Sequence, residues 1–66
     1  MSGDREPVEI FGTIVGTREK AIWLFDGLKR EWLPRSQIEL APVDAGEGEN
    51  VTVTMPQWLA KEKGLI

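Results

Sequence analysis

The stretch that decides the fold is KAIWLFDGLKREWL, residues 20–33, in which two apolar runs flank Asp26-Gly27. Both runs contain Trp together with Ile, Leu or Phe, and β-branched and aromatic residues favour strands. An Asp-Gly pair between two such runs is typical of a β-hairpin, because the tight primed turn requires a positive φ at its two central residues. The stretch therefore predicts two antiparallel strands that turn at Asp26-Gly27.

The length of this turn decides which side chains lie opposite one another. With a two-residue loop the opposed pairs are Phe25 with Leu28, Trp23 with Arg30, and Ala21 with Trp32. A four-residue loop keeps these residues on the same face, whereas a three-residue loop moves one strand to the other face. The other face carries a second apolar row, made of Ile22, Leu24 and Leu33. The hairpin is therefore apolar on both faces, and only one of them can enter a core.

Outward from the hairpin, the pattern predicts shorter elements on both sides. Alternating and β-branched residues predict strands at residues 8–15, 38–40 and 51–54, with a bend or bulge at Gly12. A tight turn is expected at residues 34–37, and a Gly-rich, acidic loop at residues 42–50. Pro56 near the start, basic residues in the last turn and Gly64 after the end are typical of a two-turn helix.

Five short antiparallel strands usually curl into a small barrel, which removes exposed sheet edges. We therefore predict a mainly β fold: a small five-stranded antiparallel barrel, Src-homology-like or oligonucleotide-binding-like, with a short C-terminal helix. The alternative is an open twisted sheet covered by the helix. The barrel is expected to form one domain over residues 7–66, after a disordered N-terminus at residues 1–6. A helix carrying Trp58 and Leu59 is the most economical cover for whichever face of the hairpin stays outside the core.

The composition argues against catalysis. The 66 residues include no His and no Cys, which removes the usual general base, the usual nucleophile activated at low pKa, and the commonest metal ligands. Ser36 follows Pro34-Arg35, where its hydroxyl is expected to satisfy nearby backbone. We therefore expect a protein that is not an enzyme and that uses no cofactor, metal or small-molecule substrate. The sequence has no run of about 20 apolar residues, so we expect a soluble cytoplasmic protein rather than a membrane protein.

Charge is unevenly distributed along the chain. The net charge is −3. Residues 18–35 carry five basic and three acidic residues, a local excess of +2, whereas residues 36–55 carry four acidic residues and no base. Such polarity suits a protein partner at least as well as a nucleic acid.

Aromatic and basic residues alternate along the hairpin, and they form the candidate partner-binding site. Its members are Arg18, Lys20, Trp23, Arg30, Trp32 and Arg35. Rings interleaved with bases are used by platforms that stack single-stranded nucleic acid. The competing interpretation is that Trp32 and Phe25 belong to the core, because so small a chain needs large rings inside it.

Two functions fit these residues. A non-catalytic protein-interaction module, including self-association as a homodimer, is favoured because the hairpin has more apolar surface than one core can take. A single-stranded nucleic-acid-binding accessory protein is the alternative, and the acidic net charge argues against it because phosphate contacts supply most of the affinity of such proteins.

Three segments resemble a group of small bacterial and phage proteins that have no assigned activity. These segments are Lys20-Ala21-Ile22, the run WLPRSQI at residues 32–38, and PQWLA at residues 56–60 with KGL at residues 63–65. The group shares a strand containing A-I, a W-[IL]-P-[KR]-S-Q turn and a terminal W-L-A-x-x-K-G-L segment. The resemblance implies a phage or prophage setting and an accessory role near DNA metabolism or host takeover. It assigns no catalytic or binding role to any residue.

Overall fold

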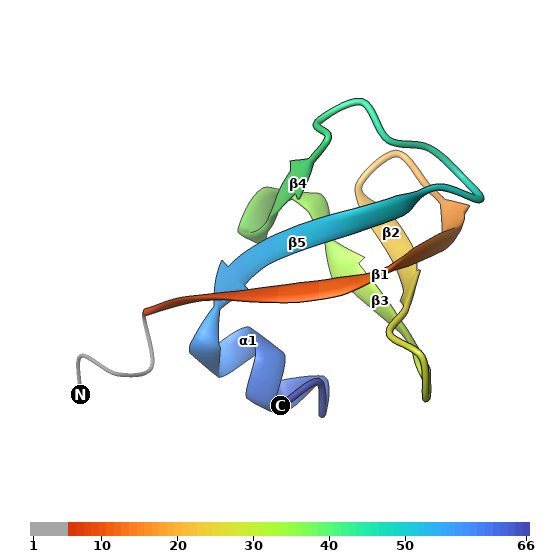
Figure 1. The fold of residues 1–66 in the computed structure, drawn as a ribbon. Helices are drawn as coiled ribbons and strands as arrows, with labels where there is room; N and C mark the ends of the chain where they lie inside the picture. The colour runs from red at the N-terminus through yellow and green to blue at the C-terminus, as the bar shows by residue number, and fades with distance from the viewer. Residues whose placement is uncertain (1–5) are drawn as a thin grey trace.

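The computed structural model of the protein describes residues 6–66. Its elements are β1 (Pro7–Thr17), β2 (Ala21–Phe25), β3 (Arg30–Pro34), the 3₁₀ helix η2 (Arg35–Gln37), β4 (Glu39–Ala41), β5 (Asn50–Pro56) and α1 (Gln57–Glu62) (Figure 1). The predicted strands and the predicted C-terminal helix are all present. Most of their ends lie within one or two residues of the predicted positions. Residues 1–5, most of the predicted disordered segment, lie outside the described residues.

The five strands form one antiparallel sheet in the order β3-β2-β1-β5-β4. The long strand β1 holds it together, because residues 7–13 pair with β5 and residues 13–17 pair with β2. The edge strands β3 and β4 do not pair with each other, so the sheet stays open. The closure expected of a barrel is thus not found, and the architecture is that of the alternative, an open sheet with a helix beside it (Figure 1).

The irregularity in β1 lies at Val15 rather than at the predicted Gly12. The pairing with β2 shifts between Ile14 and Gly16, which leaves Val15 as the extra residue of a bulge. Gly12 remains in regular register opposite Val51. A Cβ atom at Gly12 would lie 2.5 Å from the carbonyl oxygen of Phe25. The glycine is therefore explained by the close approach of the β2 backbone and not by a bulge.

Of the loop lengths left open by the sequence, the hairpin has the four-residue one and not the two-residue loop common for Asp-Gly. Phe25 pairs with Arg30, so four residues connect β2 to β3. A type I′ turn centred on Asp26-Gly27 requires a positive φ at both residues. Gly27 has φ +105°, but no residue other than glycine has a positive φ in the described part of the chain, so Asp26 does not meet this requirement. Instead the Asp26 carboxylate accepts hydrogen bonds from the backbone N–H groups of Leu28 (2.8 Å) and Lys29 (2.9 Å). The longer loop keeps the predicted faces but moves every opposed pair by two residues.

The core lies on one side of this sheet. It takes the inner row of the hairpin, in which Ile22, Leu24 and Leu33 are completely buried. The other core residues are Ile10, Ile14, Ala45, Val51, Val53, Met55, Leu59 and Ala60. Because Leu59 and Ala60 belong to α1, the helix joins the same core as the inner row. The prediction that α1 covers the hairpin face left outside the core is therefore wrong, because the helix packs on the side of the inner row and not on the side that carries Trp23 and Trp32.

Candidate interaction face

The outer row of the hairpin brings Trp23 and Trp32 directly opposite each other. Backbone bonds join Asp26 to Lys29 and Arg35 to Lys20 at the two ends of the hairpin. Hydrogen-bonded pairs alternate along an antiparallel ladder, so the Trp23–Trp32 pair is a non-hydrogen-bonded one, in which side chains approach most closely. The two rings are stacked, with centroids 5.4 Å apart and planes inclined by 7°.

The bulge in β1 makes room for this pair. Because Val15 is extra, Gly16 lies opposite Trp23 in the register between β1 and β2. A Cβ atom at Gly16 would lie 3.3 Å from the Trp23 ring and 4.0 Å from the Trp32 ring. Both rings thus lean over the glycine of the neighbouring strand. Larger residues at position 16 would push the rings away from the sheet.

Arginine side chains lie over the aromatic rings. The Arg18 guanidinium is 5.0 Å from the centroid of Trp32. The Arg30 guanidinium is 5.7 Å from the centroid of Trp23 and 5.4 Å from that of Phe25. These distances are those of cation–π contacts, which are worth about 0.5–1 kcal/mol at exposed sites. We call the five residues Arg18, Trp23, Phe25, Arg30 and Trp32 the tryptophan–arginine face.

The prediction that the rings at positions 25 and 32 belong to the core is wrong. Trp32 is 36% exposed, and Trp23 and Phe25 are half-buried, whereas no part of Leu33 is accessible to solvent. The inner row fills the space that the core offers on this side of the sheet. The contacts of the rings include each other, Gly16 and the arginines.

The remaining predicted site residues lie beside the tryptophan–arginine face. Arg35 supports it, because its Nε donates to the Arg18 carbonyl at 3.1 Å and its backbone N–H donates to the Lys20 carbonyl at 2.8 Å. Lys20 is exposed in the turn before β2 and contacts none of the rings. Sequence reasoning therefore found four members of the face and one supporting residue. It left Phe25 off the site, although the alternation already placed Phe25 on the same side.

Charge on this face is not neutralised by any carboxylate of residues 6–66. Arg18, Arg30 and Arg35 are exposed, and none has a carboxylate within 4.0 Å among residues 6–66. The hairpin does contain an ion pair, Lys29 to Glu31 at 3.6 Å. Asp26 is engaged with the turn backbone, and those hydrogen bonds hold the pKa of its carboxyl below the ordinary value. The guanidinium groups are therefore free to meet a carboxylate from elsewhere.

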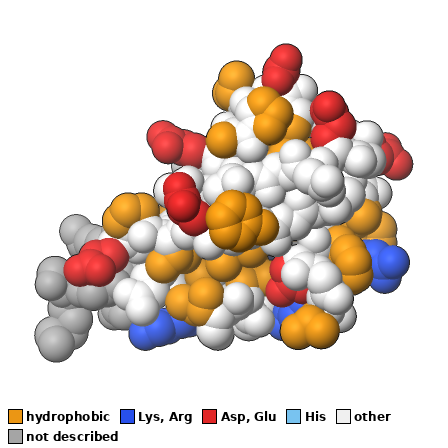
Figure 2. Space-filling model, in the orientation of Figure 1, with side chains coloured by type: hydrophobic (Ala, Val, Ile, Leu, Met, Phe, Trp, Pro, Cys, Tyr) orange, Lys and Arg blue, Asp and Glu red, His pale blue; other side chains and the backbone are white. Residues whose placement is uncertain are grey.

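The other half of the sheet carries the opposite charge. On β1, β4 and the loop before β5 the exposed acidic residues are Glu9, Glu39, Asp44, Glu47 and Glu49. In Figure 2 acidic side chains are spread over this side of the molecule, and basic ones are seen only near its margins. The charge asymmetry of the sequence is therefore also an asymmetry in space.

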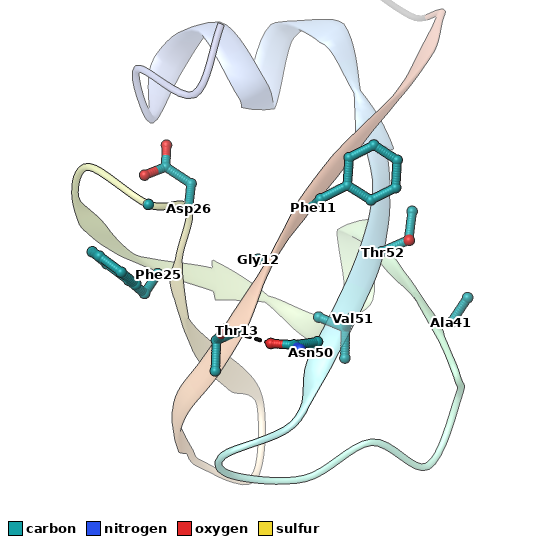
Figure 3. A pocket seen from close by; sticks show the side chains of 10 residues that line it. Phe11, Gly12, Thr13, Phe25, Asp26, Ala41, Asn50, Val51 and Thr52 are labelled. Atoms are coloured by element: carbon teal, nitrogen blue, oxygen red, sulfur yellow. Dashed lines mark hydrogen bonds between the residues drawn. The ribbon is translucent and has the colours of Figure 1, made fainter.

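A shallow depression of about 440 Å³ separates the two halves (Figure 3). Phe11 and Phe25 line it from opposite sides of β1, and Thr13 Oγ1 donates to Asn50 Oδ1 at 2.7 Å between them. The charged residue in its lining is Asp26, which is already bonded to backbone N–H groups. The depression thus combines apolar rings with neutral hydroxyl and amide groups, and it presents no pair of groups arranged for acid–base chemistry.

Neither a metal site nor a membrane-spanning helix is found in the described part of the chain. Within residues 6–66, no three acidic side chains gather closely enough to hold a metal ion. The helix α1 has six residues, and no helix in this part of the chain is long and apolar enough to cross a bilayer.

Comparison with known proteins adds no relative: no family model, curated protein or solved structure matches this chain.

Proposed function

We propose that the protein is a non-catalytic interaction module, and that its tryptophan–arginine face binds an acidic segment of another protein. The observation that carries this proposal is a stacked tryptophan pair, half-buried at Trp23 and 36% exposed at Trp32, whose arginines have no carboxylate partner among the described residues. Trp and Arg are the residues most enriched among those that dominate interface energies. They are here assembled on a strand scaffold that holds them in place before any partner arrives.

The geometry suits carboxylates in particular. A guanidinium within cation–π distance of a ring still has N–H groups to donate, because it carries five of them in a planar fork. It can therefore donate two parallel hydrogen bonds to one carboxylate without leaving the ring. Arg18 and Arg30 each lie over a ring, so two acidic side chains could bind on either side of the tryptophan pair. Apolar atoms between those acidic side chains would cover the exposed ring edges.

Nucleic acid fits the same face less well. A base stacks on a ring face, but one face of each tryptophan is turned to the other and a guanidinium lies over each ring. A base would have to displace an arginine or separate the pair. The net charge of −3 would also oppose a phosphate backbone that extends past this half of the sheet.

A second copy bound through the same face is also disfavoured, because it would set the arginines of both copies against each other. Self-association would have to use the acidic half of the partner copy instead. The phage or prophage setting and the accessory role remain predictions from the sequence resemblance.

The proposal can be tested by selecting binders from a displayed library of random peptides. We expect enrichment of peptides that contain several Asp or Glu residues and apolar residues between them. The double variant Arg18→Gln/Arg30→Gln should lose this enrichment, with affinity reduced about tenfold or more. Lys20→Gln is the matched control, since it removes one nearby charge without touching a ring, and it should retain most of the binding.

Equal enrichment by the double variant would exclude the face as the binding site. The same protein should be titrated with single-stranded oligothymidine, with Trp58→Phe as background so that fluorescence reports on the tryptophan pair. Salt-sensitive quenching by the oligonucleotide, without selection of acidic peptides, would replace the proposal with the nucleic-acid function.

A further inference from the structure

The free edge of the sheet lies next to the tryptophan–arginine face. Strand β3 ends the sheet on this side and pairs with β2 alone. The backbone hydrogen bonds at Asp26–Lys29 and at Lys20–Arg35 determine which opposed residues of β2 and β3 form hydrogen-bonded pairs and which do not. Residues 31 and 33 therefore direct their N–H and C=O groups toward β2. The residues that alternate with them are Arg30, Trp32 and Pro34, and their backbone groups point toward the open edge of the sheet.

These outward groups form a template for another strand. Among residues 6–66, no hydrogen-bond partner is found for the outward N–H and C=O groups of Arg30 and Trp32 or for the C=O of Pro34. Pro34 lacks an N–H group at a position where that group would face away from β2, so it costs the β2–β3 ladder no bond. The residues whose backbone is free are also those whose side chains belong to or adjoin the face. One ligand could therefore use both.

We propose that the acidic segment binds as an added β-strand along β3. This inference rests on the proposed function and adds the mode of binding to it. The added strand bonds with the free backbone groups of Arg30 and Trp32, as in other cases where a peptide extends a sheet. Its side chains alternate, with carboxylates on the outer side next to Arg30 and apolar side chains on the inner side next to Leu33.

Self-pairing through this edge is opposed by charge. Antiparallel pairing of two β3 strands centred on Trp32 sets Lys29 opposite Arg35 of the second copy, and like charges opposite each other destabilise a sheet. The other edge, β4, is less suited to receive a strand. It has three residues, and Pro42 and the acidic loop follow directly. The observations therefore favour a different, acidic chain on β3.

The probe for this mode is a capped peptide of alternating Glu and Val. Its control has the same composition with the glutamates grouped at one end, which keeps the charge but loses the alternation. In the Trp58→Phe background we expect the alternating peptide to change tryptophan fluorescence and to bind roughly tenfold more tightly than the grouped one. Arg30→Gln should reduce the difference.

Amide hydrogen exchange then reports on the backbone. In the free protein the N–H groups of Arg30 and Trp32 should exchange fast, while those of Glu31 and Leu33 should already be protected by β2. Bound peptide should slow exchange at Arg30 and Trp32 by about tenfold or more. N-methylation of every second peptide residue should abolish binding when the methylated N–H groups are those that face β3. It should leave binding unchanged when the methylated N–H groups face away from β3.

The outcomes separate the two proposals. Binding of acidic peptides without protection of Arg30 and Trp32, or equal binding of both peptides, overturns strand addition and leaves the proposed function intact. If neither the designed peptides nor any peptide of the random library binds, both proposals fail. Protection confined to Glu39–Ala41 would place the added strand on β4 and would also overturn the inference.

Discussion

The two halves of the sheet are made alike on the inside and differently on the outside. Strand β5 follows a simple alternation, with Val51 and Val53 in the core and Thr52 and Thr54 half-buried on the other side. Strand β2 places Ile22 and Leu24 in the same core but carries aromatic rings on its outer row. Core formation explains the inner rows of both strands. It leaves the outer row of β2 unexplained, and this is the row that we propose binds a partner.

The largest expected effect tests whether the two rows of the hairpin really differ. Leu33→Ala removes a side chain with no exposed surface, and such substitutions cost about 2–5 kcal/mol. The free energy of unfolding, measured with urea and circular dichroism, should fall far more for Leu33→Ala than for Trp32→Ala next to it. Equal losses would mean that the tryptophan row is part of the core.

The second prediction concerns the strand that joins the halves. Gly12 lies where β1 passes between its two partners, and a Cβ there would meet the Phe25 carbonyl at 2.5 Å and Leu24 at 3.1 Å. Gly12→Ala must move backbone, so we expect a loss of about 1–3 kcal/mol. Gly46→Ala is the control, since its Cβ meets only the Glu49 carboxylate, at 3.7 Å, and its effect should stay within about 0.5 kcal/mol.

The third prediction compares one exposed ring from each half. Trp32→Ala loses a stacked partner and a cation–π contact, together worth about 1–2 kcal/mol of stability. Phe11 is 70% exposed on the other half, so Phe11→Ala should change stability by less than about 0.5 kcal/mol. In binding assays with acidic peptides only Trp32→Ala should lose affinity. A comparable loss for Phe11→Ala would move the site toward the depression between the halves.

The smallest effect is the pH dependence of the hairpin turn. Backbone hydrogen bonds from Leu28 and Lys29 lower the pKa of Asp26 in the folded protein. A lowered pKa stabilises the fold above the unfolded value of about 3.9, and this contribution is lost as pH falls through the folded pKa. The stability difference between wild type and Asp26→Asn should therefore shrink below about pH 4. A difference that stays constant down to the lowest accessible pH would show that the ionised carboxylate does not matter.

Much of the fold could be predicted because it depends on local patterns. Strand runs, the Asp-Gly turn, Pro34, and the Pro56 to Gly64 signals each act within a few residues, and all the corresponding elements are present. The faces of the hairpin were also predictable, because a four-residue loop and a two-residue loop give the same parity. The register between β2 and β3 could not be predicted, because the Asp26 carboxylate competes with the backbone carbonyls of a tight turn for the same N–H groups.

The candidate site divides in the same way. The sequence by itself determined that aromatic and basic residues share one side of the hairpin, since strand alternation does not depend on the rest of the chain. Only the tertiary structure decided that this side faces outward. Two apolar rows competed for one core, and that choice depends on where β1, β5 and α1 place their own buried side chains. Whether the sheet closes is likewise a long-range property, because it depends on two edge strands that never pair.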